Sequence, residues 1–408
     1  MRNEMVKGKW FCVLAVALAA LLLVTACASS TTPPTGEKVL EIGDLAQLTG
    51  GGASADQPCF MAVQDYVRYF NEERGIPGVT IEVVWRDSAT DNAAFISGYR
   101  ILADRGVPLI YSSSTNGLEA TKSRFEKDQI PAVAGGATGP LVYPPGWVYC
   151  AWATQGEAAT AVLDYFIENW NEDRPPRLQF FVVDGSFGRG PAEEATMYAE
   201  SIGFEVLPLE LCGYVVIDAT TQLLRIRERE ADLVYIQNII TGAGPIMRDA
   251  ERLGLQENMH FAGTEWSVGE PLIEMAPVSA EGFLASRAIP WFGETEIPGI
   301  KTMIDRQTRY HGKAEERPEY MGGWVYGAIV CESVKLALDD VGYENLDGPA
   351  VKRALESMKD FDVDGMVKIT FGLEDRRGTR DYAVYQVQSG KLVRLTDWRE
   401  VPILVPQM

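Results

Sequence analysis

The sequence contains very few of the side chains that carry most acid–base enzyme chemistry. Only two of its 408 residues are histidines, His260 and His311, so few histidines are available to form a catalytic site. His260 opens an apolar segment and His311 ends a polar one, and a structural or surface role suits both. The sequence also lacks the GxSxG, HExxH and GxxxxGKS/T patterns. We therefore expect a protein that is not an enzyme and holds no cofactor.

Cysteines are scarce as well, and their spacing excludes the common zinc sites. Two of the six lie within the first 27 residues, and the other four are far apart and form no CxxC pair. An exported protein can join cysteines in disulfides, but small buried thiols are an equally good interpretation. The sequence predicts no metal site and leaves open the pairing of these four, which are Cys59, Cys150, Cys212 and Cys331.

The apolar run near the N-terminus is too short to span a bilayer. Residues 10–24 carry no charge, but this stretch of about 15 residues falls short of the roughly 20 that a spanning helix needs. Three basic residues precede it and Val24-Thr25-Ala26-Cys27 ends it, as in a secretory signal peptide. This ending resembles the bacterial lipoprotein signal, although a signal peptide that merely contains a cysteine is the alternative. We expect residues 1–26 to be removed and Cys27 to carry a lipid.

Composition limits what the exported chain can bind. Residues 27–38 are rich in serine, threonine and proline, which predicts a flexible tether. The net charge of −20 falls to about −22 when the signal, with three basic residues and one acidic residue, is removed. Such an acidic surface argues against nucleic acid and against broad contact with anionic lipid. The roughly 370 residues that follow the tether suit two compact lobes better than one core.

Strands and helices are expected to alternate along the chain. Short β-branched or apolar segments between turn residues are typical of strands, and apolar residues at three- and four-residue spacing are typical of helices. Such a succession favours parallel sheets covered by helices on both faces. A first series places strands at 39–46, 80–86, 108–112 and 131–134, with helices at 57–71, 93–103 and 118–127.

A second series of the same kind predicts a second, similar lobe. Its strands are expected at 178–184, 205–210, 233–237, 260–263 and 282–286, with helices at 191–202, 219–229 and 245–253. Helices at 300–310, 321–338 and 350–358 follow, and a hairpin at 381–388 and 391–395 ends the chain.

A glycine-rich segment after the first expected strand allows two interpretations. Residues 50–55 fit the GxGxxA pattern of dinucleotide-binding domains, in which an acid after the second strand binds the ribose. The acid available here, Asp87, lies 32 residues beyond Ala55, well past the usual spacing of about 20. A loop that lets any ligand approach a helix N-terminus is the better interpretation. A secreted nicotinamide-dependent oxidoreductase remains the alternative from another functional class.

Several short motifs occur in order along nearly the whole exported chain. They are EIG (41–43), LTG (48–50), NEERGIPG (71–78), RDSATD (86–91), LIYSSST (109–115), VDGSFGRG (183–190), FAGTEW (261–266) and WVYGA (324–328). Together they resemble the solute-binding proteins of branched-chain-amino-acid-type ABC transporters, the leucine/isoleucine/valine-binding family, whose relatives bind amino acids, amides, urea and aromatic acids.

The resemblance implies a type I periplasmic-binding-protein fold: two similar α/β lobes, each a parallel sheet flanked by helices, joined by three crossovers. On this basis lobe 1 comprises residues 39–153 with 289–372, and lobe 2 comprises 154–288 with 373–408. The implied function is that of a monomeric, lipid-anchored, extracytoplasmic subunit that closes around a small carboxylate-bearing ligand, such as an amino acid, and presents it to an ABC permease. The alternatives are an aromatic acid or amide as ligand, and a ligand sensor in place of a transport subunit.

The resemblance also implies the ligand contacts. In lobe 1, strand-end residues hold the ligand carboxylate, and in lobe 2 an aromatic residue packs over the ligand while an acid pairs with an ammonium group. Where amino-acid binders often have tyrosine after the strand at 233–237, this chain has Ile239 and Ile240, so we expect a more apolar pocket. The implied ligand-binding residues are Tyr111, Ser112, Gly136, Ala137, Thr138, Phe187, Glu265 and Trp266.

Overall fold

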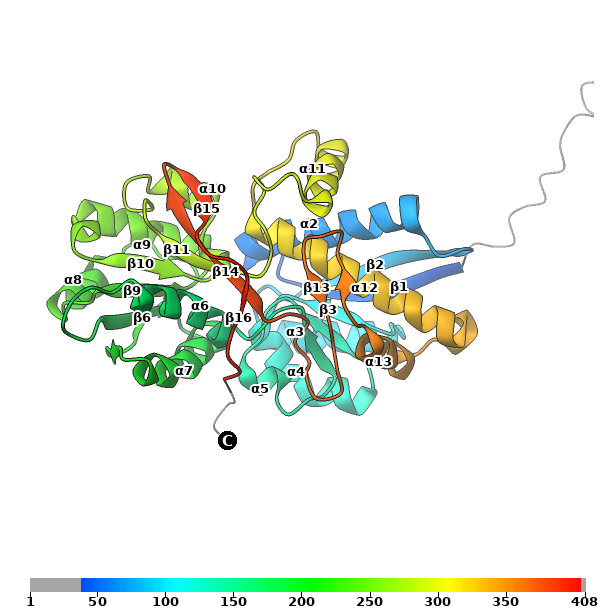
Figure 1. The fold of residues 1–408 in the computed structure, drawn as a ribbon. Helices are drawn as coiled ribbons and strands as arrows, with labels where there is room; N and C mark the ends of the chain where they lie inside the picture. Colours follow the sequence, from blue (N-terminus) through cyan, green and yellow to red (C-terminus); the bar gives the residue numbers. More distant parts are fainter. Residues whose placement is uncertain (1–37, 405–408) are drawn as a thin grey trace, which may run out of the picture.

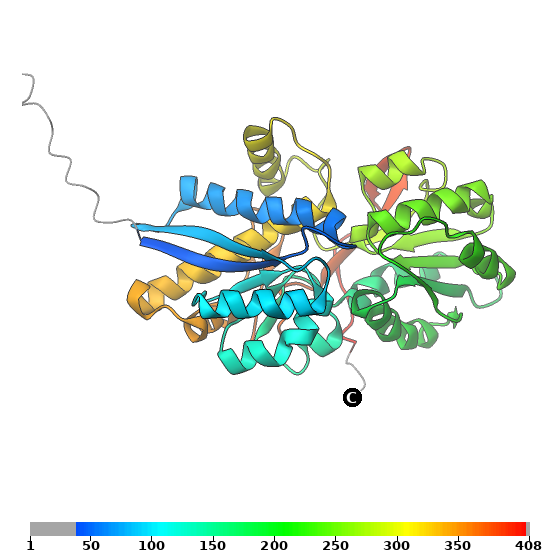
Figure 2. The ribbon, with the colours of Figure 1, turned by 180° about the vertical axis from the view of Figure 1, so that it is seen from behind.

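The computed structural model describes residues 38–404, which form two lobes side by side (Figures 1 and 2). The predicted signal peptide, Cys27 and all of the predicted tether except its last residue lie outside these residues. Each lobe is built on one sheet with helices on both faces, and three segments of chain connect the lobes. The predicted α/β architecture is confirmed.

The sheet of lobe 1 is parallel throughout and has the strand order β2-β1-β3-β4-β5. Helices α2 (Ala53–Tyr69) and α12 (Pro318–Val341) pack closely on one face, where the backbone of Cys59 leaves no room for a side chain at Gly323. Helix α3 (Asn92–Asp104) covers the opposite face through Leu102, which packs against Gly43. The strands are β1 (Lys38–Ala46), β2 (Val79–Asp87), β3 (Ile110–Ser112), β4 (Ala132–Ala134) and β5 (Val148–Cys150).

The remaining elements of lobe 1 are helices and one small hairpin. Helix α12 is buried almost along its whole length, because it lies between α2 and the rest of the lobe. The other helices are α4 (Thr115–Asp128), α5 (Gly139–Val142), α11 (Pro298–His311) and α13 (Gly348–Ser357), and the hairpin pairs β12 (Phe361–Asp362) with β13 (Lys368–Ile369).

The sheet of lobe 2 repeats the topology of lobe 1. Its parallel part has the order β8-β6-β9-β10-β11, with β7 continuing beside β6, so the second strand again lies outside the first. Strand β14 then pairs antiparallel with β11, which extends the sheet with the last part of the chain. The strands are β6 (Arg177–Val183), β7 (Glu205–Val206), β8 (Glu210–Cys212), β9 (Leu233–Gln237), β10 (His260–Gly263), β11 (Leu284–Arg287), β14 (Asp381–Gln388), β15 (Lys391–Arg394) and β16 (Arg399–Glu400).

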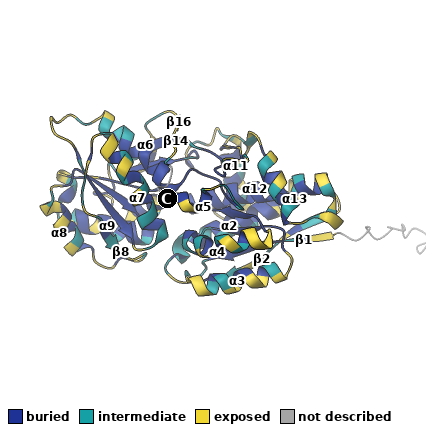
Figure 3. Ribbon diagram, turned by 90° about the horizontal axis from the view of Figure 1, so that it is seen from below, coloured by how far each residue is buried: buried dark blue, intermediate teal, exposed yellow. Residues whose placement is uncertain are grey.

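Strand β6 shows why this sheet has two buried faces. Successive strand side chains point to opposite faces, and Phe180 and Val182 join one hydrophobic cluster while Phe181 and Val183 join the other. A run that is apolar at every position is what a parallel strand covered on both sides requires. The inner strands of both lobes are accordingly buried (Figure 3). The helices of lobe 2 are α6 (Gln155–Glu168), α7 (Ser186–Ser201), α8 (Thr220–Glu228), α9 (Ile240–Arg252) and α10 (Glu270–Met275).

A buried ion pair fastens two of the three crossovers to each other. Glu157, in the first turn of α6, pairs with Arg377 of the third crossover at 2.5 Å, and both side chains are at most 3% exposed. The other oxygen of Glu157 accepts the N–H of Thr154 at 2.9 Å and completes a capping box at the start of α6. Residues on either side of Arg377 also hydrogen-bond to both backbone groups of Cys150 at the edge of β5.

Three helix starts lie about one turn before the predicted positions. Helices α2, α7 and α9 were expected to begin at residues 57, 191 and 245, and each of these positions is at or next to a proline, a residue favoured in the first turn of a helix. Each proline is instead the sixth residue of its helix: Pro58, Pro191 and Pro245. Proline there frees the carbonyl four residues earlier. Arg317 donates to the one freed on Ser54, at 2.8 Å.

Other predictions also need correction. The strand expected at 205–210 is two short strands, because Pro208 has no N–H to donate to a sheet. Strand β5 and helix α6 were missed altogether.

All four cysteines of the described chain are free thiols, with Cys59, Cys150 and Cys331 buried. Among the described helices, none is both long enough and apolar enough to cross a membrane.

The buried pair generates a stability prediction. Replacing Glu157 by Gln removes one charge-assisted hydrogen bond of Arg377, whose remaining ion-pair partner is Asp375 at 2.7 Å, and we expect the free energy of unfolding to fall by about 1.5–3 kcal/mol. Glu168→Gln is the control, because Glu168 meets Arg399 at 3.3 Å with both side chains more than half exposed, and such pairs contribute under about 1 kcal/mol. Urea unfolding of both variants is the measurement. Equal losses in the two variants would contradict the role given to Glu157.

Candidate functional site

Both lobes contribute residues to a cleft between the two sheets, as expected for the carboxyl ends of parallel strands. Its volume is about 520 Å³, including the space open at its mouth. Lobe 1 supplies the start of α2, the segment 113–115 before and at the start of α4, and the turn after β4. Lobe 2 supplies Phe187, Tyr214, Ile239 and Trp266.

Hydroxyl and amide groups of lobe 1 form a hydrogen-bonded rim. Ser113 donates to Oδ1 of Asp56 at 2.5 Å and accepts from the Gln47 side chain at 3.3 Å. Ser114 caps α4 by accepting the N–H of Gly117 at 3.3 Å. The positive end of the α4 dipole therefore faces the cleft beside an acid, Asp56.

Asp56 is the least expected group of the cleft. It is 2% exposed, and its Oδ2 accepts the backbone N–H of Gln47. Burial raises the pKa of Asp56 to about 6, against the lowering effect of its hydrogen bonds from Ser113 and Gln47. Asp44 lies beneath it on β1, and neither of its carboxyl oxygens has a hydrogen-bond partner within residues 38–404. Burial, and then the neighbouring Asp56, raise the pKa of Asp44 well above its usual range.

A layer of aromatic hydroxyls supports the cleft from below. The thiol of Cys59, which lines the cleft, lies 2.9 Å from the Tyr111 hydroxyl. The Tyr111 ring stacks on Tyr326 at 5.2 Å between centroids. Tyr326 in turn accepts a hydrogen bond from the Trp152 indole and donates to the carbonyl of Gly135, at 2.5 Å for the latter. These contacts hold the turn at Gly135 in place.

The wall from lobe 2 is aromatic and aliphatic. Phe187, in the first turn of α7, stacks on Tyr214 with 6.2 Å between ring centroids and 19° between planes. Tyr214 reaches across to lobe 1, where Gly51 leaves room for its side chain. Ile239 also lines the cleft, as the sequence predicts for a pocket more apolar than that of amino-acid binders.

The structure brings three of the eight implied ligand residues to the cleft: Gly136, Phe187 and Trp266. The hydroxyl of Ser112 is instead turned into the sheet, where it donates to the carbonyl of Leu45 at 2.7 Å. It acts there as a structural group, and its neighbours Ser113, Ser114 and Thr115 line the cleft. The sequence does not show which of the consecutive serines at this strand end faces the cleft, because side chains alternate in direction along an extended segment.

The other implied residues are buried beside the cleft. Thr138 donates its hydroxyl to Glu119, Ala137 is fully buried, and Tyr111 lies in the aromatic layer beneath. Glu265 opens into a second cavity of about 270 Å³, and Trp266 lines both spaces. Burial raises the pKa of Glu265, with Arg287 acting in the opposite direction.

Among the cleft residues that sequence reasoning missed are Gln47, Asp56, Cys59 and Tyr214. Asp56 and Cys59 lie three residues apart on α2, so a helix begun at its true start would have placed both on one face. Tyr214 lies in a loop between β8 and α8, where no periodicity guides a prediction.

The glycine-rich segment does not present a free acid to a dinucleotide. Asp87 accepts the N–H of Leu48 at 2.9 Å and the hydroxyl of Thr49 at 2.7 Å, so both of its oxygens fasten the loop between β1 and α2. Gly50 has φ of +82°, a conformation that glycine adopts without strain. Over residues 38–404 there is also no cluster of three or more His, Cys, Asp or Glu side chains suited to a metal ion.

Comparison with known proteins gives a consistent result. The family model described as "Periplasmic binding protein" matches residues 18–391. The Leu/Ile/Val-binding protein homolog 3 of Brucella melitensis is 21% identical over 365 residues, which cover 87% of this chain and 93% of that protein.

Solved structures agree over the whole fold. A branched-chain amino acid ABC transporter structure from Thermus thermophilus, with bound valine, is similar with a TM-score of 0.83, 25% identity, and coverage of 90% of this chain and 97% of that one. A fatty acid ABC transporter substrate-binding protein from Thermomonospora curvata is similar with a TM-score of 0.81, 19% identity, and coverage of 92% and 96%. Because the family model matches most of this chain, the chain belongs to the periplasmic binding protein family, whose members bind solutes outside the cytoplasm.

Proposed function

We propose that this chain is the lipid-anchored solute-binding subunit of an ABC importer, which closes around a small carboxylate-bearing ligand and presents it to the permease. The observation that carries the proposal is the cleft, because one wall comes from each lobe and a bound ligand would contact both. Valine in one similar structure and the fatty acid in the name of another share a carboxylate, which supports that ligand class.

Contacts across the cleft support a closing motion. The hydroxyls of Ser54 and Thr241, in the first turns of α2 and α9, lie 3.3 Å apart. Glu194 of α7 accepts the N–H of Gly139 in lobe 1, and burial raises its pKa to about 7. These weak polar contacts can form and break as the lobes move. We propose that the lobes divide at residues 153/154, 288/289 and 372/373, where the chain passes between the two sheets.

The first prediction tests binding and closure together. In a thermal-shift screen against amino acids, fatty acids, aromatic acids and their amides, we expect at least one carboxylate to stabilise the protein, by about 2.7 kcal/mol at 100 times its Kd. Because the ligand favours the closed form, its radius of gyration by small-angle scattering should fall on binding. A binding ligand that leaves the radius unchanged would contradict closure, and a screen without any carboxylate ligand would contradict the function.

A second prediction concerns the anchor. Val24-Thr25-Ala26-Cys27 is the proposed processing site, so Cys27→Ser should remove the lipid and release the protein from the membrane fraction. Fractionation followed by mass spectrometry of the N-terminal peptide is the measurement. A mature protein that begins anywhere other than residue 27 would contradict the proposal.

The third prediction follows from the acid in the cleft. Asp56 is neutral below its pKa of about 6 and ionised above it, and an ionised Asp56 repels a carboxylate ligand. Affinity for a carboxylate that carries no ammonium group should therefore be greatest below pH 6 and weaken by on the order of tenfold, or about 1–2 kcal/mol, as pH rises from 5.5 to 7.5. Titration calorimetry across this range is the measurement.

Asp56→Asn is the matched variant, because an amide has the same shape and can still bond to Gln47 and Ser113. It should bind the same carboxylate with an affinity that is nearly independent of pH. A pH dependence that persists unchanged in Asp56→Asn would show that another group is responsible.

A further inference from the structure

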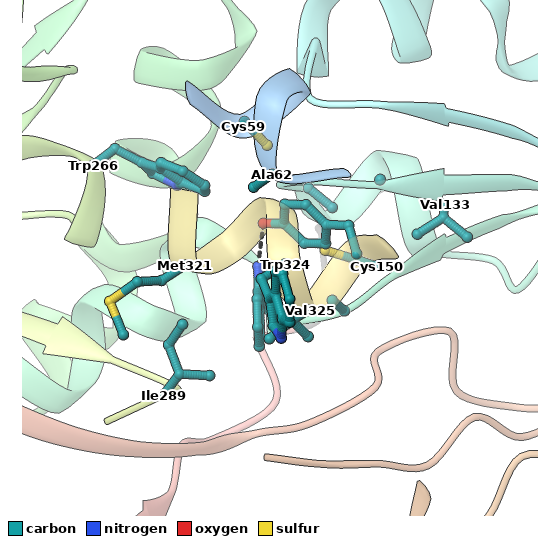
Figure 4. Packing of buried hydrophobic residues seen from close by; sticks show 14 of the residues in the cluster. Cys59, Ala62, Val133, Cys150, Trp266, Ile289, Met321, Trp324 and Val325 are labelled. Atoms are coloured by element: carbon teal, nitrogen blue, oxygen red, sulfur yellow. Dashed lines mark hydrogen bonds between the residues drawn. The ribbon is translucent and has the colours of Figure 1, made fainter. Parts of the chain in front are cut away.

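Behind Trp266 lies a second cavity at the junction of the lobes. It encloses about 270 Å³, including space open to solvent, and is lined by Trp152 of the first crossover, by Arg287 and Ile289 at the second, and by Gly322 of α12. Trp266 lines both this chamber and the cleft, and Gly322 makes room for its ring, since an added Cβ would lie 3.1 Å from Cη2. In Figure 4, Trp266 extends toward α12, with Cys59 of the cleft and Ile289 of the chamber on either side of it in that view.

Arg287 is the unusual group of this chamber. Its side chain is 1% exposed, and Nε and Nη1 have no hydrogen-bond partner among the residues that the structure describes. Nη2 reaches only the sulfur of Met321, at 3.6 Å. The guanidinium lies over the ring of Trp291, 4.5 Å from its centroid. A buried charge that lacks hydrogen bonds is costly, so this arrangement favours an anionic partner.

The nearby acids do not supply that partner. Glu319 is paired with Arg317 at 3.0 Å, and Glu294 accepts the hydroxyl of Tyr385 at 2.6 Å. Glu265, across the chamber, accepts the hydroxyl of Thr264 at 3.2 Å. Within the described chain none of these carboxylates forms an ion pair with Arg287.

We propose that the chamber is the anion subsite of the ligand site, in which Arg287 donates hydrogen bonds to the ligand carboxylate while the rest of the ligand lies against Trp266 toward the cleft. This inference deepens the proposed function and rests on it. It also moves the carboxylate away from the strand ends of lobe 1, where Ser112 and Thr138 already use their hydroxyls inside the protein and Asp56 opposes an anion.

The experiment measures the coupling between Arg287 and the charge of the ligand. Three matched probe pairs are titrated into the full exported chain: L-valine and L-valinamide, hexanoate and hexanamide, benzoate and benzamide. For the pair that binds, we expect wild type to prefer the carboxylate by at least about 30-fold, and Arg287→Met to reduce that preference to within about threefold. Arg287→Lys keeps the charge but not the planar donor group, and should retain an intermediate preference.

Two further variants separate this role from a structural one. Arg394 pairs with Glu294 at 3.5 Å and lines neither space, so Arg394→Met should keep the wild-type preference. The double variant Arg287→Met with Glu265→Gln removes one charge of each sign and replaces the single variant if that variant fails to fold. We expect it to lose the preference for the carboxylate as well. A wild-type preference in either Arg287→Met variant would overturn the subsite and leave the proposed function standing. Wild type that binds no carboxylate of the panel would overturn both.

Discussion

The ion pair of Glu157 with Arg377 constrains any movement of one lobe relative to the other. It lies at the point where the first and third crossovers meet, and neither charge can reach water. Separating the two charges would cost several kcal/mol, which is comparable with the energy that a ligand supplies by preferring one conformation. The closing motion that we propose would therefore leave this pair intact.

The charged groups of the site lie in two places, in the cleft and in the chamber. The cleft floor carries Asp56 and, beneath it, Asp44, so this end of the site has negative character once Asp56 ionises. The chamber at the junction carries Arg287, whose Nε and Nη1 have no hydrogen-bond partner among the described residues. Opposite charges in the cleft and in the chamber, which share Trp266 as a wall, would orient a polar ligand that reached both, in addition to any affinity that they provide.

Because a parallel strand such as β6 must be apolar at every position, alternation of strands and helices predicted most strands of both sheets, but not β5. The helix starts at Pro58, Pro191 and Pro245 were misplaced, since local preference puts proline in the first turn and only tertiary contacts, such as Arg317 with the Ser54 carbonyl, satisfy the group it frees. Helix α6 carries a capping-box signature, Thr154 to Glu157, that could have revealed it. Arg287 has no sequence signal, because only the folded chain shows that its N–H groups lack partners.

The position of the chamber links ligand recognition to closure. Its walls come from the first crossover, the second crossover and α12, so a carboxylate bound to Arg287 would contact elements whose mutual arrangement changes when the lobes move. A ligand shifts a conformational equilibrium only through a difference in its affinity for the two forms. In this structure Arg287 is 1% exposed, so hydrogen bonds from it to an anion would be strong because water is excluded. Opening the cleft would admit water to the same donors and weaken those bonds, and this difference would supply free energy for the closure that we propose.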